Sequence, residues 1–530
     1  MAKNEDRGGA TRREHHAEPV VFPVRVAAVD IGSNGIRFAA AEFSTLSTYA
    51  ILEEERFPVR LGHGVFLTGR LAPAAMDAAI GVLRDVHARL ERLGVAHVRA
   101  VATSAVREAA NGDEFLARLQ TSSGLAIEVI TGAEEARLVH LAVRSRVPLA
   151  SDPWLLVDLG GGSVEVSLVD GSGILWSESH TMGSVRLLEE LTGAADAPGA
   201  FRRLLEEYIA TLRIPSAARY RKPIGVIATG GNIEALARLA GHPPDATGTA
   251  TIETGELRAL IETLSRLSFR QRIDELGLRE DRADVILPAA MVYERVAELA
   301  GASRIVAPGV GVRDGVLLDL VADLTVAGGE SDRHAREVLA GALALGRRYM
   351  FEEPHATHVA ALAVSLFDQL GELHGLASAD RRALLAASLL HDVGAYVSYK
   401  RHHKHSFYLI SESDLAGFSP PEIQVVANVA RYHRKGEPAG DHESYAALPK
   451  AAQQRVRKLA ALLRLADALD REHGQRVQAV RATVGDRVVT LTLAGEGDML
   501  LERWALRRKA ALFEGVFERE LKVRNERGGG

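Results

Sequence analysis

The sequence predicts a mixed α/β protein with two related lobes, an all-helical domain and a small C-terminal α/β cap. Two segments, AVDIGSNGIRFAAAEF from Ala28 and LVDLGGGSVEVSLVD from Leu156, are imperfect copies of one another. Each has an apolar strand that ends in Asp, then a Gly-rich turn, then a second strand. Strands and helices alternate after each copy, whereas the later part of the chain has a helical period. This order predicts a duplicated lobe with a cleft between the two copies.

Within the first lobe, apolar and β-branched runs come first and predict three strands. A long amphipathic segment then predicts a helix, because its apolar residues recur at intervals of three and four. Shorter strand and helix patterns follow, up to a helix that begins with acidic residues. In chain order the expected elements are strands 24–31, 36–43 and 49–61, helix 72–94, strand 98–103, helix 109–120, strand 126–130 and helix 131–143.

The second lobe repeats this logic, and two changes of pattern follow it. The segment ADLTVAGGESDRH marks a shift to Ala- and Leu-rich sequence that is rich in His and helical in period. The last part returns to strands and then to a helix. The expected strands of the second lobe are 154–159, 164–170, 174–180, 225–230 and 304–308, and the cap has strands 477–485 and 487–495 and helix 502–523.

These patterns divide the chain into five segments. We expect a disordered tail, because the first residues carry mixed charge and Gly without periodicity. The boundaries are 1–23 for the tail, 24–150 and 151–325 for the two lobes, 330–475 for the helical domain and 476–530 for the cap. Both Gly-rich turns end the first strand of their lobe, so the cleft between the lobes is the expected site.

Composition excludes several classes of protein. Hydrophobic content of 47% and charged content of 25% are ordinary for a globular protein. A net charge of −5 argues against dedicated nucleic-acid binding. No apolar stretch reaches the roughly 18 to 20 residues that span a bilayer, and the start has no signal-peptide core. We therefore expect a cytoplasmic location and no membrane partner. The chain has no Cys, so any metal must be held by His, Asp, Glu and water.

The first Gly-rich turn contains Asp30, Gly32, Ser33 and Asn34. Glycine lets the backbone approach phosphate oxygens closely, and successive N–H groups bind anions. Asp30 is suited to a divalent cation that neutralises the same oxygens. A plain β-turn, in which Asn and Gly only supply the geometry, explains this turn equally well.

The second turn is more specific. Gly160, Gly161, Gly162 and Ser163 form a phosphate-binding loop in this interpretation. Asp158 and Glu165 flank it on the two strands of a hairpin, so both carboxylates can reach one metal ion. Consecutive glycines lose extra entropy on folding, which argues against a purely structural turn.

Two further glycine turns and one arginine complete the candidate phosphate contacts. Gly230 and Gly231 precede a helix whose N-terminal N–H groups suit an anion. The segment PGVGVRDG from Pro308 is a similar turn, and either turn is explained equally by a strand-to-helix connection. Arg107, in ATSAVREAAN, is either a phosphate clamp or a surface charge.

The helix start ITGAEEARL contains two adjacent acids, Glu134 and Glu135. Hydrolysis of a terminal phosphate needs a water that a carboxylate orients and deprotonates. A Glu in a first helical turn is also favourable with the helix dipole, which explains one of the two without any catalytic role.

The motifs DIGSN, ATSAVREAAN, GAEEARL, DLGGGSVE, ATGGNIEALA and PGVGVRDG, in that order, resemble the exopolyphosphatase and guanosine pentaphosphate phosphohydrolase (Ppx/GppA) family. The resemblance covers about residues 24 to 322 and implies two actin-like (ribonuclease H-like) lobes. It implies Mg²⁺-dependent hydrolysis of terminal phosphates from inorganic polyphosphate, or of the 5′ phosphate of pppGpp. Glu135 is then the catalytic base, and Asp158 and Glu165 match the family's metal-binding and water-positioning acids. Family members often have Ser in place of Gly35, so a hydroxyl contact is missing here. The family also suggests a homodimer.

The helical domain resembles the HD phosphohydrolase superfamily, in which His, His–Asp and Asp residues bind a divalent metal. The corresponding residues here are His358, His391, Asp392 and Asp467, with His405 and His433 as further candidates. Imidazole and carboxylate ligands suit Mn²⁺, Fe²⁺ or Zn²⁺. A degenerate scaffold without metal is the alternative. Basic residues around the same segments predict a track for a long polyanion, with scattered surface charge as the alternative; they are Lys400, Arg401, Lys404, Arg431, Arg434 and Lys435.

The sequence therefore predicts an exopolyphosphatase that uses Mg²⁺ and a glutamate-activated water. A pppGpp 5′-phosphatase shares every motif and is the nearest alternative. A sugar or acetate kinase has the same fold but needs an acceptor site. A non-catalytic sensor of alarmone or polyphosphate, and separate nucleotide hydrolysis in the helical domain, remain as further hypotheses.

Overall fold

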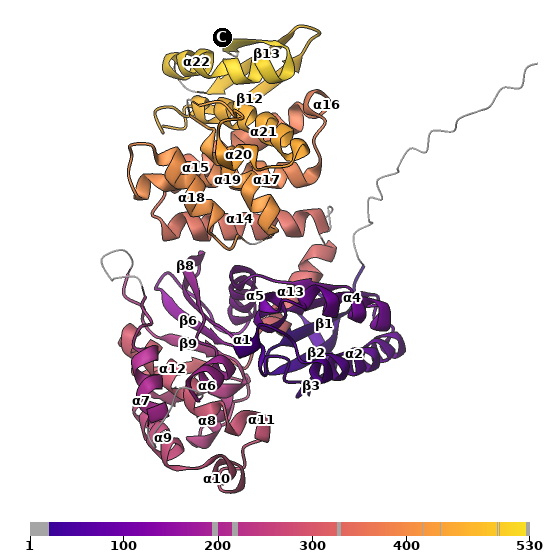
Figure 1. The fold of residues 1–530 in the computed structure, drawn as a ribbon, viewed down its shortest axis with the longest axis vertical. Coiled ribbons are helices and arrows are strands. Elements are labelled where there is room, and N and C mark those ends of the chain that lie inside the picture. The colour runs from indigo at the N-terminus through magenta and orange to yellow at the C-terminus, as the bar shows by residue number, and fades with distance from the viewer. Residues whose placement is uncertain are drawn as a thin grey trace, which may run out of the picture.

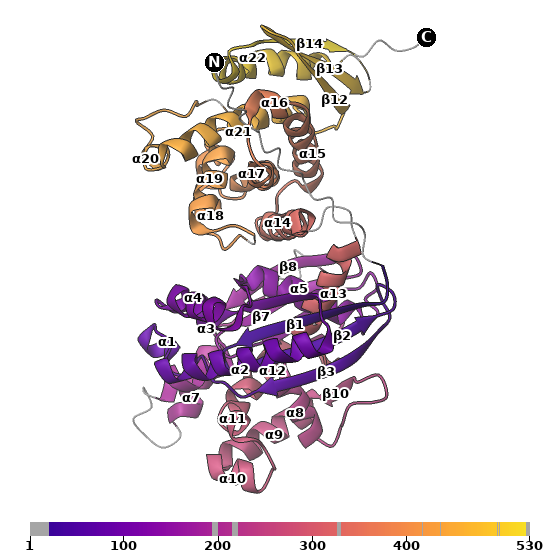
Figure 2. The ribbon, with the colours of Figure 1, turned by 90° about the vertical axis from the view of Figure 1, so that its right-hand side faces the viewer.

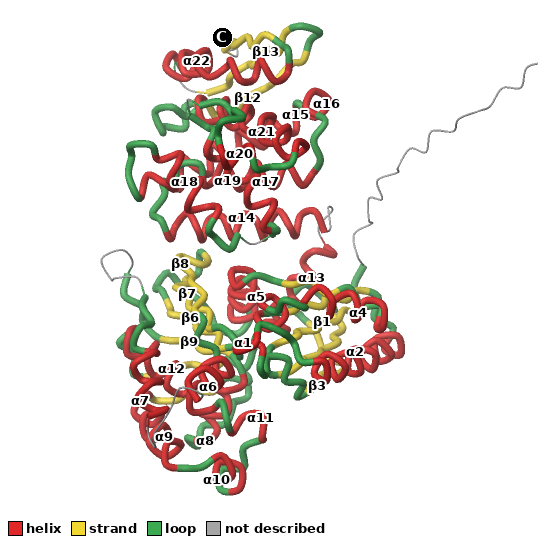
Figure 3. Tube along the Cα trace, viewed as in Figure 1, coloured by secondary structure: helices red, strands yellow, loops and turns green. Residues whose placement is uncertain are grey.

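The computed structural model describes residues 21–192, 200–214, 221–325, 330–415, 417–434, 436–495, 497 and 499–525. The predicted tail therefore lies almost entirely outside the described residues. The chain forms two α/β lobes, a helical domain above them and a cap at the far end (Figure 1). Figure 3 shows that strands are confined to the lobes and the cap.

The first lobe is built on a five-stranded sheet in the order β3-β2-β1-β4-β5. β1 and β2 form the hairpin of the first repeat and pair antiparallel, while β4 lies parallel to β1. The strand expected over 49–61 ends earlier, because Pro58 has no N–H to donate to a ladder. Its elements are β1 (Val24–Gly32), β2 (Gly35–Phe43), β3 (Tyr49–Phe57), α1 (Val65–Thr68), α2 (Pro73–Leu93), β4 (His97–Ala102), α3 (Ser104–Glu108), α4 (Gly112–Ser123), β5 (Ile127–Val129) and α5 (Gly132–Arg144).

The second lobe has the same core order, β8-β7-β6-β9-β11, with β10 added at one edge. β6 and β7 are the hairpin of the second repeat, and β9 lies parallel to β6. The duplicated topology follows the duplicated sequence. Its elements are β6 (Trp154–Leu159), β7 (Val164–Asp170), β8 (Gly173–His180), α6 (Ser184–Thr192), α7 (Ala200–Ile209), β9 (Val226–Thr229), α8 (Gly231–Leu239), β10 (Ala250–Glu253), α9 (Thr254–Arg266), α10 (Phe269–Asp274), α11 (Glu280–Ala283), α12 (Ile286–Ala300) and β11 (Arg304–Ala307). The helix α13 (Val312–Thr325) follows β11 and packs against α5 of the first lobe.

The helical domain lies beyond the edge strand β8 of the second lobe, with α14 next to that strand (Figure 2). Arg348 of α14 pairs with Glu178 of β8 at 3.0 Å. The core is Ala- and Leu-rich, which explains the strong helical period of this segment. Its elements are α14 (Glu330–Arg348), α15 (Glu353–Gln369), α16 (Gly371–His374), α17 (Ser378–Leu390), the 3₁₀ helix η1 (Val393–Tyr396), α18 (His402–Ser411), α19 (Pro420–Arg431), α20 (Glu443–Ala446) and α21 (Lys450–Leu469).

The cap is a three-stranded sheet with one helix, β12 (Val477–Val484), β13 (Val488–Gly495), α22 (Leu500–Phe517) and β14 (Glu520–Asn525). The helix predicted over 502–523 ends earlier, at Phe517. Glu518 has a left-handed backbone that stops the helix, and the alternating residues after it add a strand parallel to β13. In the described part of the chain, no helix has the length and apolarity that a bilayer crossing needs.

Candidate functional site

The two Gly-rich turns meet between the lobes. A Cβ at Gly161 would lie 2.8 Å from the Cβ of Ser33, so only Gly allows this approach. Ser33 is buried, and its Oγ is 3.0 Å from the Oγ of Ser104. Asn34 crosses the interface, since its Nδ2 donates to the carbonyl of Asp281 at 2.9 Å. The duplicated hairpins therefore face one another in space.

Three buried carboxylates gather beside these turns. Glu135 lies in the first turn of α5, while Asp158 and Glu165 stand opposite one another on β6 and β7. One oxygen from each lies within 4.8 Å of the others. Only 5% of Glu135, 8% of Asp158 and 2% of Glu165 is exposed. Three negative groups this close favour a bound cation or a shared proton.

The hydrogen bonds of these carboxylates leave oxygens open. Thr229 Oγ1 donates to Asp158 Oδ1 at 2.5 Å, and Ser179 Oγ donates to Glu165 Oε1 at 2.9 Å. Oε2 of Glu165 and Oε2 of Glu135 accept no hydrogen bond from any described residue. Arg107 Nη1 is 3.9 Å from that Glu135 oxygen, too far for a hydrogen bond. The open oxygens are available to a metal ion or a water.

Burial shifts the protonation of all three groups. Desolvation, and after it repulsion from Glu165, raises the pKa of Glu135 well above its usual range. Desolvation also raises the pKa of Asp158. For Glu165, desolvation and the charge of Asp158 raise the pKa to about 7. A carboxylate with a raised pKa is a stronger base, as a group that takes a proton from water must be.

The two adjacent glutamates of α5 have different environments. Glu134 accepts from Arg99 at 3.2 Å and from Arg137 Nε at 2.7 Å. Asp319 of α13 accepts from the same two arginines, which closes a buried ionic network. Glu134 therefore ties α5 to β4 and α13, whereas Glu135 points to the other acids. Glu134 is therefore the glutamate with a structural role, as the sequence analysis expected of one of the two.

A cavity of about 680 Å³ extends from the turns between the lobes. It reaches Asp30, Gly32, Ser33 and Asn34 of the first turn and Glu135, Asp158, Gly160 and Gly161 beside the second. Gly230, Gly231 and the turn Gly309–Asp314 form another wall. Arg107, Gly162, Ser163 and Glu165 are not among the described residues that line this cavity.

Some of these predicted residues have structural partners instead. Arg107 Nη1 donates to the carbonyl of Ile130 at 2.7 Å. A Cβ at Gly162 would overlap the Oγ of Ser104 at 2.6 Å and the Phe66 ring. Asp30 is paired with Arg37 at 2.8 Å, so its carboxylate is already neutralised. Asp30 is therefore a weaker candidate for metal than Asp158 or Glu165.

Six arginines and seven carboxylates line the cavity, and four of the arginines, Arg56, Arg238, Arg279 and Arg282, were not among the sequence candidates. Arg56 pairs with Asp281 at 2.5 Å, and Arg313 pairs with Glu54 at 2.9 Å. Burial, and next the neighbouring Arg56, lowers the pKa of Arg282 to about 10. Such crowding of cations favours an anionic ligand. The arginines that line the cavity are Arg37, Arg56, Arg238, Arg279, Arg282 and Arg313.

Gly35 is explained by one of these arginines. A Cβ at Gly35 would lie 2.9 Å from the carbonyl of Phe57 and 3.1 Å from Nη2 of Arg56. The Arg56 side chain thus fills the space that a Ser would use, and its Nη2 donates to the carbonyl of Asn34 at 2.7 Å. A guanidinium stands where the family resemblance suggests a hydroxyl.

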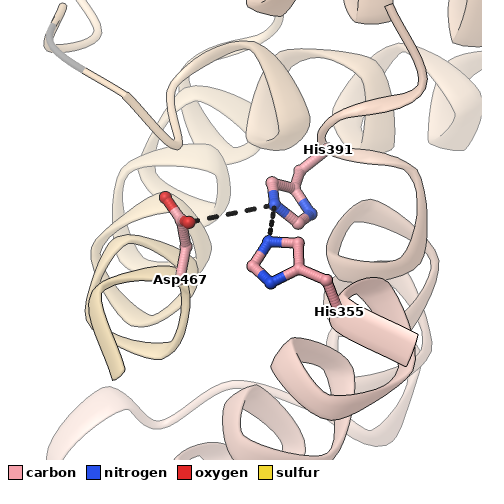
Figure 4. A group of neighbouring side chains, drawn as sticks. All are labelled: His355, His391 and Asp467. Atoms are coloured by element: carbon pink, nitrogen blue, oxygen red, sulfur yellow. Dashed lines mark hydrogen bonds and ion pairs between the residues drawn. The ribbon is translucent and has the colours of Figure 1, made fainter. Parts of the chain in front are cut away.

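In the helical domain, the prediction that His358 belongs to the ligand cluster was wrong. Its Nε2 contacts the carbonyl of Val477 at 2.8 Å, outside the cluster. His355, one helical turn earlier on α15, is buried and faces His391 and Asp467 instead (Figure 4). Helical spacing allowed either residue, and the packing of α15 against α17 and α21 selects His355. Similarly, His402 rather than His405 stands beside His433.

The residues of the predicted polyanion track have different environments. Lys400, Arg401 and Lys404 are exposed. Arg431 is held by Ser444 Oγ at 2.6 Å, and Arg434 lies over the ring of Tyr399 at 5.7 Å. Lys435 lies outside the described residues. The polyanion track therefore stays a prediction.

A glycine-lined cavity with buried carboxylates and a glutamate with a raised pKa is suited to phosphate hydrolysis. The Ppx/GppA phosphatase family profile matches residues 41–324, and the profile of domain III of the same family matches residues 339–510. The chain belongs to the Ppx/GppA phosphatase family.

Solved structures support the same assignment. An exopolyphosphatase from Cytophaga hutchinsonii is 27% identical, with a TM-score of 0.53, over 56% of this chain and 98% of that chain. An exopolyphosphatase-like protein is 27% identical, with a TM-score of 0.51, over 56% of this chain and 97% of that one.

Proposed function

We propose that the interlobe site removes terminal phosphates from inorganic polyphosphate, with Glu135 as the base and a divalent cation, Mg²⁺, beside it. The observation that carries this proposal is the open, buried Glu135 oxygen next to Asp158 and Glu165. The six arginines and the glycine loops provide the anion-binding surface around it.

The carboxylate cluster fits a magnesium ion. Asp158 and Glu165 offer oxygen ligands, which Mg²⁺ prefers, and their mutual repulsion is relieved by a cation. When bound, the ion would neutralise phosphate oxygens and so make the phosphorus more susceptible to attack. Thr229 and Ser179 orient the two carboxylates by donating to one oxygen of each.

Glu135 performs the proton transfer in this mechanism. A water beside its open oxygen attacks the terminal phosphorus and gives its proton to Glu135, while the bridging P–O bond breaks. The products are orthophosphate and a chain that is shorter by one unit. Backbone N–H groups of the loops at Gly32 and Gly160 stabilise the charge that develops on the phosphoryl oxygens.

The cavity wall favours polyphosphate over pppGpp. Its lining, taken over the described residues, contains six arginines and seven carboxylates, and no aromatic side chain on which a guanine base would stack. A polyanion needs repeated positive charges, and Arg56, Arg282 and Arg313 supply them beyond the catalytic end.

Phosphate release from polyphosphate and from pppGpp, measured in parallel on the purified protein, tests the proposal. We expect a higher kcat/KM for polyphosphate and loss of both activities on removal of Mg²⁺. A higher kcat/KM for pppGpp would assign the alternative substrate. Tight binding of either anion without phosphate release at saturating Mg²⁺ would instead indicate a sensor.

A further inference from the structure

The edge strand β8 lies between the interlobe site and the helical domain. It is the last strand of its sheet, and among the described strands it pairs only with β7, to which the turn at Gly171 and Ser172 joins it. Helix α14 of the helical domain lies beside it (Figure 2). An edge strand has backbone groups that no neighbouring strand pairs with. Contacts from the helical domain therefore help to determine where β8 lies.

Two consecutive arginines at the end of α14 hold β8. Arg347 Nη1 donates to the carbonyl of Ile174 at 2.6 Å, and Arg348 Nη2 is 3.0 Å from Glu178 Oε1. Arg347 is itself fixed, because its Nε and Nη2 donate to the two carboxylate oxygens of Glu353 at 2.8 and 2.6 Å. Such a bidentate pair fixes the direction of the guanidinium. The two arginines thus contact β8 at points that are about 13 Å apart along the strand.

Ser179, the residue after Glu178, reaches the carboxylate site. Successive side chains of a strand point to opposite faces, so Ser179 points away from Glu178. Ser179 lies opposite Glu165 in the register of β7 and β8, and its Oγ donates to Glu165 Oε1 at 2.9 Å. The Ser179 side chain is exposed, so its position follows from the β8 backbone rather than from packing around it.

The start of α5 lies against the same serine. A Cβ at Gly132 would lie 3.0 Å from the Cβ of Ser179 and 3.6 Å from Glu165 Oε1, so glycine allows a close approach here. Glu135 follows in the first turn of this helix. A shift of β8 would therefore change the separation of Glu165 from Glu135 as well as the direction of the Glu165 carboxylate.

We propose that docking of the helical domain on β8 positions Glu165 for catalysis, with Arg347 and Arg348 as the positioning residues. This inference rests on the proposed function for its activity readout. Reacting groups must be held closely, since a displacement of about 1 Å lowers a rate by on the order of 10²-fold. Because β8 has one strand neighbour, the two arginines supply contacts that a second strand would otherwise make. The interlobe site reaches its full rate only while the helical domain is docked on this strand.

This arrangement makes the helical domain a route of regulation. A ligand that binds this domain more tightly in the docked state than in the undocked state would raise the rate at the interlobe site. A ligand with the opposite preference would lower that rate. Neither ligand would need to contact the cavity between the lobes.

Reversal of the Arg348–Glu178 pair tests the proposal. Arg348→Glu and Glu178→Arg each place like charges together, whereas the double variant restores the pair. Both side chains are partly exposed, at 40% and 30%, and such pairs add little to stability, so the variants should fold. We expect kcat for phosphate release from polyphosphate to fall at least about tenfold in each single variant and to return to within about twofold of the parent in the double variant. The KM should stay within about threefold, because the cavity arginines are unchanged.

Arg202→Ala is the matched control. Arg202 also makes a partly exposed ion pair, but its partners Glu206 and Glu262 lie on α7 and α9 rather than on β8. Its kcat should stay within about twofold of the parent. Arg348→Gln removes the docking pair without repulsion and serves if a reversed variant fails to fold. Its kcat should also fall, and a kcat equal to that of the parent would contradict the proposal.

Ser179→Ala tests whether Arg348 acts through the serine. This exposed substitution removes the hydrogen bond to Glu165 and leaves the contacts between α14 and β8 in place. It should lower kcat by at least about tenfold with KM retained. It should add nothing to the loss in Arg348→Glu, because both changes break the same chain of contacts. Losses that multiply in the combined variant would overturn the route through Ser179.

Mg²⁺ binding distinguishes this inference from the proposed function. Calorimetric titration of the parent and of Glu165→Gln gives the part of Mg²⁺ binding that belongs to the carboxylate cluster. Loss of an outer contact to a metal ligand weakens binding by about 10- to 100-fold, so both single reversals should bind Mg²⁺ at least tenfold more weakly than the parent and the double variant. A parent that binds Mg²⁺ but hydrolyses neither polyphosphate nor pppGpp would refute the proposed function alone. Equal Mg²⁺ affinity in the parent and the single reversals, or a kcat that does not recover in the double variant, would overturn the positioning role.

Discussion

Substitution of Glu165 by Gln should stabilise the metal-free protein at alkaline pH. The pKa of Glu165 is raised to about 7 by burial and by Asp158, against an ordinary value of 4.5. Each pKa unit corresponds to about 1.4 kcal/mol, so ionisation of this buried group costs the folded state on the order of 3 kcal/mol. Gln cannot ionise, and its carbonyl still accepts from Ser179 Oγ.

The pH dependence follows from the sign of the shift. Below its pKa of 4.5 in the unfolded chain, Glu165 is protonated in both states and does not change the free energy of unfolding. As pH rises toward 7, the unfolded chain releases the proton while the folded chain keeps it, so stability falls. Above the pKa that Glu165 has in the folded protein, the free energy of unfolding stays lowered by the full amount. The advantage of Glu165→Gln should therefore be near zero at pH 4 and about 3 kcal/mol at pH 8.

Urea unfolding in EDTA, followed by tryptophan fluorescence, measures this difference. Trp154 lies on β6 and Trp176 on β8, the two neighbours of the strand that carries Glu165. Glu114→Gln, at an exposed position on α4, is the matched control and should change nothing. Equal stability of the variant and the parent at pH 8, or an advantage of the same size at pH 4, would refute the reasoning.

Four further predictions concern neighbouring residues. Glu134→Gln should lower the free energy of unfolding by about 3 kcal/mol, because it breaks a buried ionic network; an unchanged urea midpoint would contradict this. Gly162→Ala should destabilise by about 1 to 3 kcal/mol through overlap with Phe66, and a normal Tm would exclude the overlap. Arg282→Ala should raise the KM for polyphosphate more than it lowers kcat, as steady-state kinetics would show; an effect confined to kcat would argue against a binding role. Gly35→Ser should weaken polyphosphate binding by displacing Arg56, and equal affinity in calorimetry would show that the guanidinium moves freely.

The sequence predicted the features that local pattern determines. The repeated hairpins at Asp30 and Asp158, and the helix that begins near Glu135, follow from periodicity and turn residues. The meeting of the two turns was inferred from duplication and is present in the fold. The boundaries were less accurate, because Pro58 ended a strand early and Glu518 ended a helix early.

Features that depend on tertiary packing were not predictable in this way. His355 and His358 lie one turn apart on α15, and periodicity alone does not say which one faces α17. Arg37 and Arg313 adjoin two of the predicted glycine turns, whereas Arg56 and Arg282 lie in no motif and come together only in the folded lobes.

The central claim is that Glu135 takes the proton from the attacking water while its neighbour Glu134 only holds the helix in place. Single-turnover release of phosphate from polyphosphate by Glu135→Gln, with Glu134→Gln as the matched neighbour, tests it most directly. We predict a loss of about 10²- to 10⁴-fold for Glu135→Gln, with polyphosphate affinity retained. For Glu134→Gln, assayed below its melting temperature, we predict a rate close to that of the parent. Comparable rates in Glu135→Gln and the parent would contradict the account.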